Sequence, residues 1–313
     1  MSPVCLRPAP CHHGNRPQPR ETVTIRSRRP GPIGAGPLTR HGPAAQNVGV
    51  TALLTVAFVL LGLAIGSFLN VCIDRLPGGR SIIAPPSQCD ACGRRLSALD
   101  LLPVLSFLWL RGRCRYCQAA LPKRLVLVEM ACGALLGGLY LFFGLEPEFG
   151  VAALWGCVFI VVFVIDLEQG LILNLIIYPS LVIALALAGL VPDMPWLQGA
   201  GGMDRWPQIA IAALGGAVGF CFFFLVAVLA ERILGREGLG WGDVKLAALI
   251  GLVCGFPLVV FVIVLGSAIG ILMALLMGRL KTGQTIPFGS ALAVASMAAI
   301  VAGEAVLELL AGA

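Results

Sequence analysis

The sequence has few charged residues. Asp, Glu, Lys and Arg together make up 12% of its 313 residues, whereas 58% are hydrophobic. A typical soluble domain carries about 25% charged residues. The mean hydropathy of +0.93 points in the same direction. The shortage of charge excludes an ordinary soluble globular domain and predicts an integral membrane protein that crosses the bilayer several times.

Several sequence signals are also missing. The chain has no internal repeat of fixed period and no glycine-rich fingerprint of a soluble nucleotide-binding fold. It has no convincing signal peptide, because no small-residue cleavage pattern ends its first apolar run. Residues 1–48 are rich in Pro, Gly and Arg and lack apolar periodicity. This composition predicts a disordered tail.

Eight apolar segments follow the tail, and most approach the roughly 20 residues needed to cross a bilayer. The predicted fold is therefore an all-α integral membrane protein with about eight transmembrane helices. The first helix is expected at 49–71, and the region 125–313 is expected to form the membrane domain. Within that region the segments are 125–144, 149–166, 171–191, 207–231, 243–255, 257–278 and 288–311. The 243–255 segment is short for a full span.

Positive charge is concentrated in two stretches. Residues 1–50 contain seven Arg and one Glu, and residues 71–124 contain nine Lys or Arg and three Asp. Basic residues beside membrane spans are topology signals, which argues against a nucleic-acid partner and places the 72–124 loop in the cytoplasm. In the loops predicted on the opposite side of the membrane, the only basic residue is Arg205. The same topology puts the Arg-rich tail on the outer side, against this charge rule. One hypothesis is that the protein begins further along the chain and that residues 1–48 do not belong to it.

Two aspartates fall at the cytoplasmic ends of predicted spans. Asp166 ends the third span, and Asp243 begins the sixth. Two carboxylates held close together cannot both ionise easily, so such a pair can perform acid and base chemistry at once, as in aspartic proteases. Alternatively, each aspartate separately caps or flanks a helix. The helix dipole favours an acid such as Asp243 at an N-terminus and disfavours Asp166 at a C-terminus.

The turn before Asp243 is rich in glycine. It reads Gly238-Leu239-Gly240-Trp241-Gly242. Glycines at Gly240 and Gly242 allow a sharp bend and the close approach of a bound chain to the carboxylate. Lys245 is a further candidate contact for a substrate, although a lysine that extends toward the headgroups is the commoner case.

Four of the eleven cysteines form two pairs in the polar loop. The pairs Cys89-x2-Cys92 and Cys114-x2-Cys117 are separated by 21 residues, close to the spacing of tetrahedral zinc sites. In a reducing cytoplasm, metal coordination is favoured over disulfides. Four cysteines leave no open coordination position. The pattern therefore predicts a structural Zn²⁺ that stabilises the small 72–124 loop domain between the first two spans.

In their order and spacing, these motifs make the chain resemble the type IV prepilin leader peptidases, membrane aspartic peptidases with a Gly-x-Gly-Asp turn. The resemblance extends from about residue 58 to 311. Further motifs that carry it are Gly66-Ser67-Phe68-Leu69-Asn70, Arg75-Leu76-Pro77, Leu110-Arg111-Gly112-Arg113-Cys114, Val128-Glu129 and Ile286-Pro287-Phe288-Gly289. One departure is Leu173-Asn174, where the family usually has a proline followed by an acid.

The resemblance implies an enzyme with two activities. One is cleavage of the leader of type IV prepilins and of type II secretion pseudopilins at the cytoplasmic face of the bacterial inner membrane. The other is methylation of the new N-terminus from S-adenosylmethionine, whose binding residues the sequence does not identify. Asp166 and Asp243 map onto the catalytic pair of the family. The four cysteines map onto its metal-binding loop, which is associated with methyl transfer.

Two other functions are compatible with parts of the pattern. In a proton- or cation-coupled carrier, Asp166, Asp243 and Glu129 would line a path through the bilayer. Carrier acids belong near the midplane, whereas the two aspartates fall at span ends, and Glu129 is most simply explained by pairing with Arg124 or Lys123. A non-catalytic assembly factor could use the zinc loop for docking, but that function leaves the glycine turn unexplained.

Overall fold

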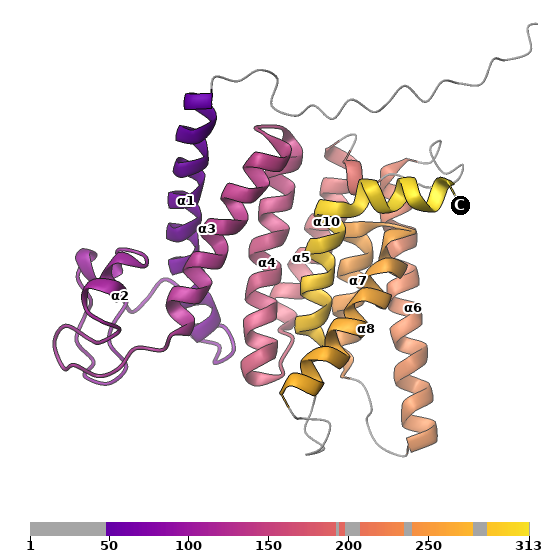
Figure 1. Cartoon of the computed structure of the whole chain (residues 1–313). Coiled ribbons are helices and arrows are strands. Elements are labelled where there is room, and N and C mark those ends of the chain that lie inside the picture. The colour runs from indigo at the N-terminus through magenta and orange to yellow at the C-terminus, as the bar shows by residue number, and fades with distance from the viewer. Residues whose placement is uncertain (1–47, 192–193, 198–206, 235–239, 278–286, 313) are drawn as a thin grey trace, which may run out of the picture. The chain divides into compact units, whose positions relative to one another are not determined.

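Eight helices correspond one for one to the apolar segments of the sequence (Figure 1). The computed structural model describes residues 48–191, 194–197, 207–234, 240–277 and 287–312. The predictions for the tail fall almost wholly outside these residues. The helices are α1 (Val48–Arg75), α3 (Arg124–Phe143), α4 (Pro147–Gln169), α5 (Asn174–Leu190), α6 (Gln208–Leu234), α7 (Trp241–Cys254), α8 (Leu258–Leu276) and α10 (Phe288–Gly312).

Six of these helices are long and apolar enough to cross a membrane, namely α1, α3, α4, α6, α8 and α10. Two are shorter, because α5 has 17 residues and α7 has 14. A helix of 14 residues is about 21 Å long, less than the roughly 30 Å of a hydrocarbon core. The described residues contain isolated β-bridges but no strand. The prediction of an all-α, multi-pass membrane protein with about eight helices is confirmed.

Small residues bring α1 and α3 into backbone contact. A Cβ atom added to Gly62 would lie 2.4 Å from the carbonyl oxygen of Cys132, and one added to Gly66 would lie 2.6 Å from Cα of Glu129. Packing of this kind replaces the hydrophobic driving force, which is weak between helices in lipid. The hairpin of α1 and α3 is therefore tight, although 48 residues separate the two helices in the sequence.

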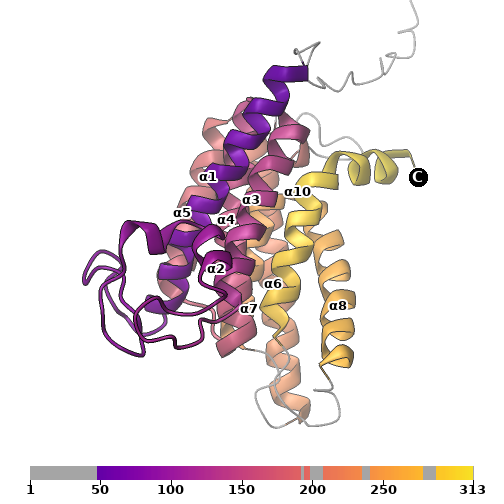
Figure 2. The ribbon, with the colours of Figure 1, turned by 60° about the vertical axis from the view of Figure 1, so that its left-hand side comes forward.

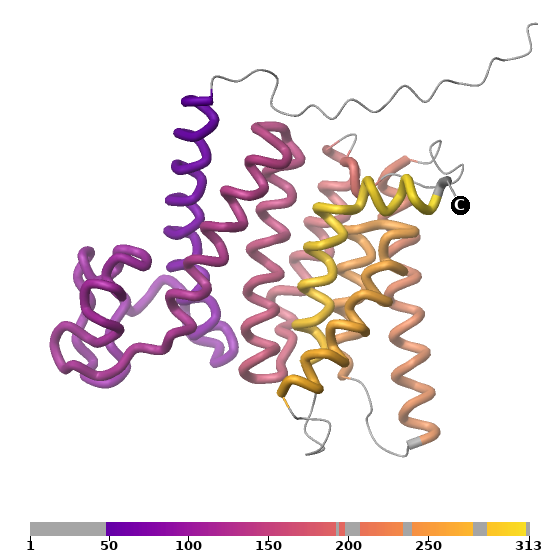
Figure 3. The backbone as a smooth tube through the Cα atoms, in the orientation of Figure 1, coloured from indigo at the N-terminus to yellow at the C-terminus, as the bar shows by residue number. Residues whose placement is uncertain are grey.

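The short helix α7 lies at the centre of the remaining helices (Figures 2 and 3). It contacts α5, α6, α8 and α10. Its backbone touches that of α6, since a Cβ atom on Gly251 would lie 2.1 Å from the carbonyl oxygen of Gly215. Leu246, Leu249 and Ile250 of α7 are fully buried. A helix enclosed in this way can begin and end inside the bundle without exposing its ends to lipid.

The loop between α1 and α3 has little regular structure. It contains a 3₁₀ turn at Ala98–Leu101 and the helix α2 (Leu105–Trp109), and it lies beside the lower ends of α1 and α3 in Figure 1. The base of the loop is closed by Asn70 of α1, whose Nδ2 donates to the carbonyl oxygen of Leu125 at 2.9 Å.

Candidate active site and metal loop

Asp166 lies in the last turn of α4, and only 5% of its surface is exposed. The helix ends at Gly170, which has a φ of 63° and donates its N–H to the carbonyl oxygen of Asp166 at 2.8 Å. Glycine is the usual residue at such a left-handed helix end, because it carries no Cβ. The cap fixes where α4 stops and therefore where this carboxyl group lies.

The first turn of α10 holds the Asp166 side chain. The backbone N–H of Ser290 donates to Oδ2 of Asp166 at 2.6 Å. The Ser290 hydroxyl lies 2.8 Å from the same oxygen and 3.0 Å from the carbonyl oxygen of Phe163, so its single proton can be donated to either. Gly289 permits this approach, because a Cβ there would lie 3.1 Å from Cγ of Asp166. The motif Ile286-Pro287-Phe288-Gly289 was noted in the sequence, but Ser290, the residue that follows it, was not predicted as part of the site.

Asp243 is the third residue of α7. Its N–H donates to the carbonyl oxygen of Gly240 at 3.0 Å, which closes the first turn of the helix. Gly238 and Leu239 of the predicted turn lie outside the described residues. Asp243 is partly buried, and its carboxyl group is subject to Coulomb repulsion from Asp166. The two aspartates, 77 residues apart in the sequence, are thus close enough to interact.

A single side chain, Ile172, lies where the three segments of this site meet. A Cβ on Gly242 of α7 would lie 2.8 Å from Cβ of Ile172, and a Cβ on Gly289 of α10 would lie 3.0 Å from its Cδ1. Ile172 belongs to the connector that follows α4. Gly242 therefore allows α7 to lie against the connector at Ile172, and a role for Gly240 and Gly242 beside a bound substrate stays a prediction.

Lys245 points to a neighbouring helix. Its Nζ donates to Oδ1 of Asn174 at 3.0 Å and lies 5.5 Å from the ring centroid of Tyr178. Both partners belong to α5. This contact gives the Leu173-Asn174 departure a structural role, because Leu173 precedes the helix and Asn174 supplies the amide oxygen that binds the lysine.

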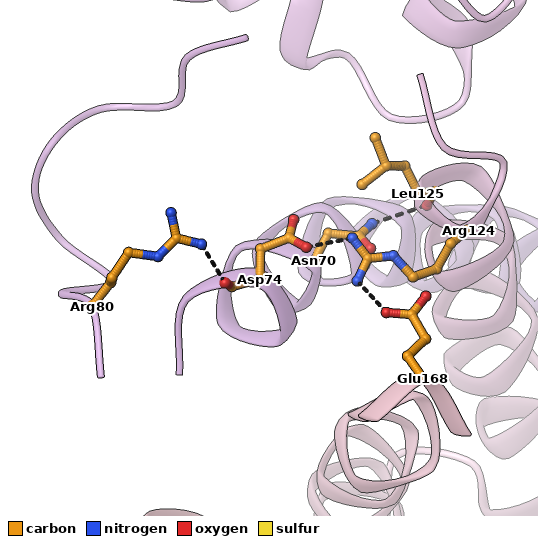
Figure 4. Close-up of polar contacts among 6 residues, drawn as sticks. All are labelled: Asn70, Asp74, Arg80, Arg124, Leu125 and Glu168. Carbon is orange, nitrogen blue, oxygen red and sulfur yellow. Dashed lines mark hydrogen bonds and ion pairs between the residues drawn. The ribbon is translucent and has the colours of Figure 1, made fainter. Parts of the chain in front are cut away.

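A cluster of charged residues joins the ends of α1, α3 and α4 (Figure 4). Arg124 at the start of α3 pairs with Asp74 of α1 at 2.5 Å and with Glu168 of α4 at 3.3 Å. The simplest explanation of Glu129, a pairing with Arg124 or Lys123, was wrong. Glu129 instead accepts the backbone N–H of Val104 at 2.8 Å, because the loop segment before α2 folds against α3.

The four predicted metal ligands come together in the loop. Their sulfur atoms all lie within 4.8 Å of one another. Each pair sits in the same kind of turn. The N–H of Cys89 donates to the carbonyl oxygen of Arg94 at 3.0 Å, and the N–H of Cys114 donates to the carbonyl oxygen of Ala119 at 2.8 Å. The Sγ atoms of Cys89 and Cys117 are 3.8 Å apart. Sulfurs around a tetrahedral Zn²⁺ with bonds of about 2.3 Å lie about 3.8 Å apart, so these four residues fit a metal ion.

The local electrostatics of this cluster favour thiolate formation at one cysteine. Backbone N–H groups of Cys117 and Tyr116 hydrogen-bond to Cys114 and lower the pKa of its thiol to about 7. A backbone hydrogen bond from Ala119 also acts on Cys117, but burial and the neighbouring cysteines outweigh it and raise the pKa of Cys117 to about 11. Bringing four thiols together is unfavourable for their common ionisation unless a cation compensates the charge.

Asp100 joins the segment that follows the first cysteine turn to the second cysteine turn. It accepts the N–H of Ser97 at 3.0 Å, Nε of Arg115 at 2.6 Å and the hydroxyl of Tyr116 at 3.4 Å. Burial acts to raise the pKa of Asp100, but the hydrogen bonds from Ser97 and Arg115 outweigh it and hold this pKa below its ordinary value. The guanidinium of Arg94 stacks on the ring of Tyr116 at 4.4 Å. The loop therefore has its own polar core.

Replacing Asp100 with Asn is expected to loosen this polar core. The change removes the ion pair and leaves Arg115 without its carboxylate, so amide hydrogen exchange should become faster across residues 97–116. Because the folded pKa of Asp100 is lowered, its stabilising effect is complete above the unfolded pKa and is lost as the pH falls through the folded one. Asp90→Asn, a change of equal charge at an exposed residue of the same loop, is the control. Equal exchange rates in both variants would contradict the role of Asp100.

An integral membrane protein with two interacting aspartates at helix ends and a four-cysteine loop has the features of a membrane aspartic peptidase. Comparison with known families agrees. Residues 60–143 match the bacterial peptidase A24 N-terminal domain, and residues 152–275 match the type IV leader peptidase family. No solved structure matches.

Curated relatives that carry the name prepilin leader peptidase/N-methyltransferase extend the match to most of the chain. The protein of Stutzerimonas stutzeri is 32% identical over 80% of this chain and 92% of its own. That of Burkholderia pseudomallei (strain 1026b) is 31% identical over 87% of this chain and 93% of its own. That of Bacillus subtilis (strain 168) is 31% identical over 82% of this chain and 97% of its own. The chain therefore belongs to the type IV leader peptidase family, and these relatives do not support the carrier hypothesis.

Proposed function

We propose that this protein removes the leader of type IV prepilins and pseudopilins at the cytoplasmic face of the bacterial inner membrane. Asp166 and Asp243 are the catalytic pair. The observation that supports this assignment is that α7 and α10 meet around Ile172 at the end of α4, where Gly289 lies against Asp166 and Gly242 directly precedes Asp243. The names of the relatives support the same activity and add methylation of the new N-terminus.

The two aspartates differ in their surroundings, and this difference suggests their roles. Ser290 places its N–H and its O–H within hydrogen-bonding distance of one oxygen of Asp166, and such donors form charge-assisted hydrogen bonds when the carboxyl group is ionised. Asp166 is then the ionised member that takes a proton from water. Asp243 is the protonated member, which donates to the carbonyl oxygen of the scissile peptide. When the gem-diol intermediate breaks down, Asp166 gives its proton to the leaving amine, and a hydroxyl of the gem-diol returns a proton to Asp243.

Replacing Ser290 with Ala is expected to lower kcat for leader cleavage about tenfold. The loss of one hydrogen bond to a charged group is worth roughly 1.5–3 kcal/mol, but the backbone N–H of residue 290 remains. KM should change little, because the hydroxyl holds Asp166 and not the substrate. Steady-state cleavage of a leader peptide checks this.

Ser296→Ala is the matched control for this variant. Ser296 is a buried serine of the same helix, and its hydroxyl donates to the carbonyl oxygen of Leu292. The control should retain full activity. Equal kcat values for the two variants would show that the Ser290 hydroxyl does not support catalysis.

We further propose that the metal of the four-cysteine cluster is Zn²⁺. Bound there, Zn²⁺ would link the two cysteine turns and stabilise the loop, without an open position for catalysis. S-adenosylmethionine is proposed as the methyl donor on the strength of the N-methyltransferase names of the relatives. The donor would supply the methyl group for the amine that cleavage exposes.

The proposed function is tested with the purified full chain in lipid vesicles. A synthetic prepilin leader peptide is incubated with S-adenosylmethionine labelled in its methyl group, and the products are analysed by mass spectrometry. The expected result is cleavage after the leader, followed by labelling of the new N-terminus. An intact peptide would overturn the peptidase assignment, and cleavage without label would overturn the methyltransferase alone.

A further inference from the structure

The loop helix α2 carries a large exposed apolar surface. Leu105, Leu108 and Trp109 are 64%, 65% and 87% exposed. Their spacing of i, i+3 and i+4 places them on one face of the helix. The preceding residues Leu101 and Leu102 add further exposed apolar surface, at 42% and 44%. We call the face formed by Leu105, Leu108 and Trp109 the α2 face.

The opposite side of α2 packs on the loop itself. Phe107 contacts Gly112, since a Cβ on that glycine would lie 2.9 Å from Cζ of the ring. The backbone of Gly112 is itself in the left-handed region, with a φ of 69°, which suits glycine. The loop therefore has a packed side and orients the α2 face away from it.

The start of α2 is held beside the membrane-spanning part of α3. Val104, just before α2, donates its N–H to Glu129 at 2.8 Å. Glu129 lies five residues after the start of α3 at Arg124, or about 7.5 Å along the helix axis. With 20 residues, α3 is about 30 Å long and only just covers a hydrocarbon core. A contact at Glu129 therefore lies inside the edge of the bilayer core.

Both ribbon views agree with this placement. In Figures 1 and 2 the loop lies alongside the lower part of α1 and α3, and it is not confined to the region below their ends. On the helices beside the loop, Phe68 of α1 and Leu127 and Met130 of α3 are also exposed.

The charges next to the α2 face suit an anionic surface. Arg111 and Arg113 follow directly and are exposed, and the region 71–124 contains nine basic residues against three acidic ones. Basic residues at this level are attracted to anionic headgroups. Tryptophan is enriched at the boundary between headgroups and acyl chains.

We propose that the α2 face binds the lipid surface of the cytoplasmic leaflet. Leu105, Leu108 and Trp109 enter the boundary between headgroups and acyl chains, and Arg111 and Arg113 contact anionic headgroups. Together with the Val104–Glu129 hydrogen bond, this second attachment fixes the loop and its cysteine cluster against the membrane.

The fluorescence of Trp109 in the full chain tests this proposal. The protein and its Trp109→Phe variant are reconstituted in vesicles of phosphatidylethanolamine and phosphatidylglycerol, with bromine at a shallow or a deep position of the acyl chains. The signal of Trp109 is the difference between the two proteins. We expect most of this signal to be lost with shallow bromine, less with deep bromine, and little with the aqueous quencher acrylamide.

A relocated tryptophan is the matched control. In the Trp109→Phe background, Tyr116→Trp places the indole beside the cysteine cluster of the same loop, where acrylamide should quench it and bromine should not. The proposal is overturned if acrylamide quenches Trp109 as strongly as this control. It is also overturned if a photo-crosslinker at position 109 reacts with a pilin substrate or a second copy of the chain instead of lipid.

Discussion

Asp166→Asn and Asp243→Asn are each expected to abolish leader cleavage. An amide has nearly the shape of a carboxyl group but cannot take or give the proton, and the loss of one acid–base group lowers a rate by about a hundredfold to ten-thousandfold. Because the two carboxyl groups act as a unit, the double variant should be hardly worse than either single one. The measurement is turnover of a leader peptide by the purified full chain.

Glu168→Gln is the matched control for these variants. Glu168 lies two residues beyond Asp166 in α4, is exposed and pairs with Arg124. The Glu168→Gln variant should therefore retain most of the cleavage activity. All variants should insert in the membrane and unfold at temperatures close to that of the unchanged protein. Near-normal cleavage by either aspartate variant would refute the catalytic pair.

Replacing Cys89 and Cys114 together with Ser is expected to remove the bound metal. Each is the buried member of its pair, and the remaining two cysteines cannot form a closed tetrahedral site. The metal content of the purified protein should fall from about one Zn²⁺ per chain to none. The binding free energy of a structural Zn²⁺ is also folding energy for a small loop, so amide exchange should rise across residues 87–120.

Cys221→Ser serves as the control for this variant. Cys221 is an exposed cysteine of α6, far in sequence from the loop, and is not part of the cluster. Its replacement should leave the metal content unchanged. Methyl transfer should fall with the metal while leader cleavage persists, since Asp166 and Asp243 lie in helices outside the loop. Unchanged metal content in the Cys89/Cys114 variant would refute the site.

Much of the fold could be predicted from local sequence. Each apolar run is bounded by polar residues or glycine, so the predicted segments agree with the observed helices to within a few residues. The 171–191 segment, for example, is the helix Asn174–Leu190. The cysteine spacing is equally local, because each pair needs only one turn of chain to bring its two sulfurs together.

The contacts that could not be predicted join distant parts of the chain. Ser290 and Asp166 are 124 residues apart, and nothing in either local sequence specifies the other. The same holds for Ile172, which contacts glycines of both α7 and α10. For Glu129, sequence reasoning chose the nearest basic residues, but a backbone N–H satisfies a carboxylate as well as a cation does. Charge pairing alone could not identify that partner.

The brevity of α7 has a consequence for the supply of water. Trp241 at its start packs on Phe224 of α6, and α6 continues for another ten residues to Leu234, or about 15 Å. Asp243 therefore lies well short of the end of its neighbouring helix. Hydrolysis consumes a water molecule at every turnover, and a helix that starts this far from the end of its neighbour leaves room for water to reach the aspartate beside protein and not through lipid. The membrane itself can stay dry and unbroken.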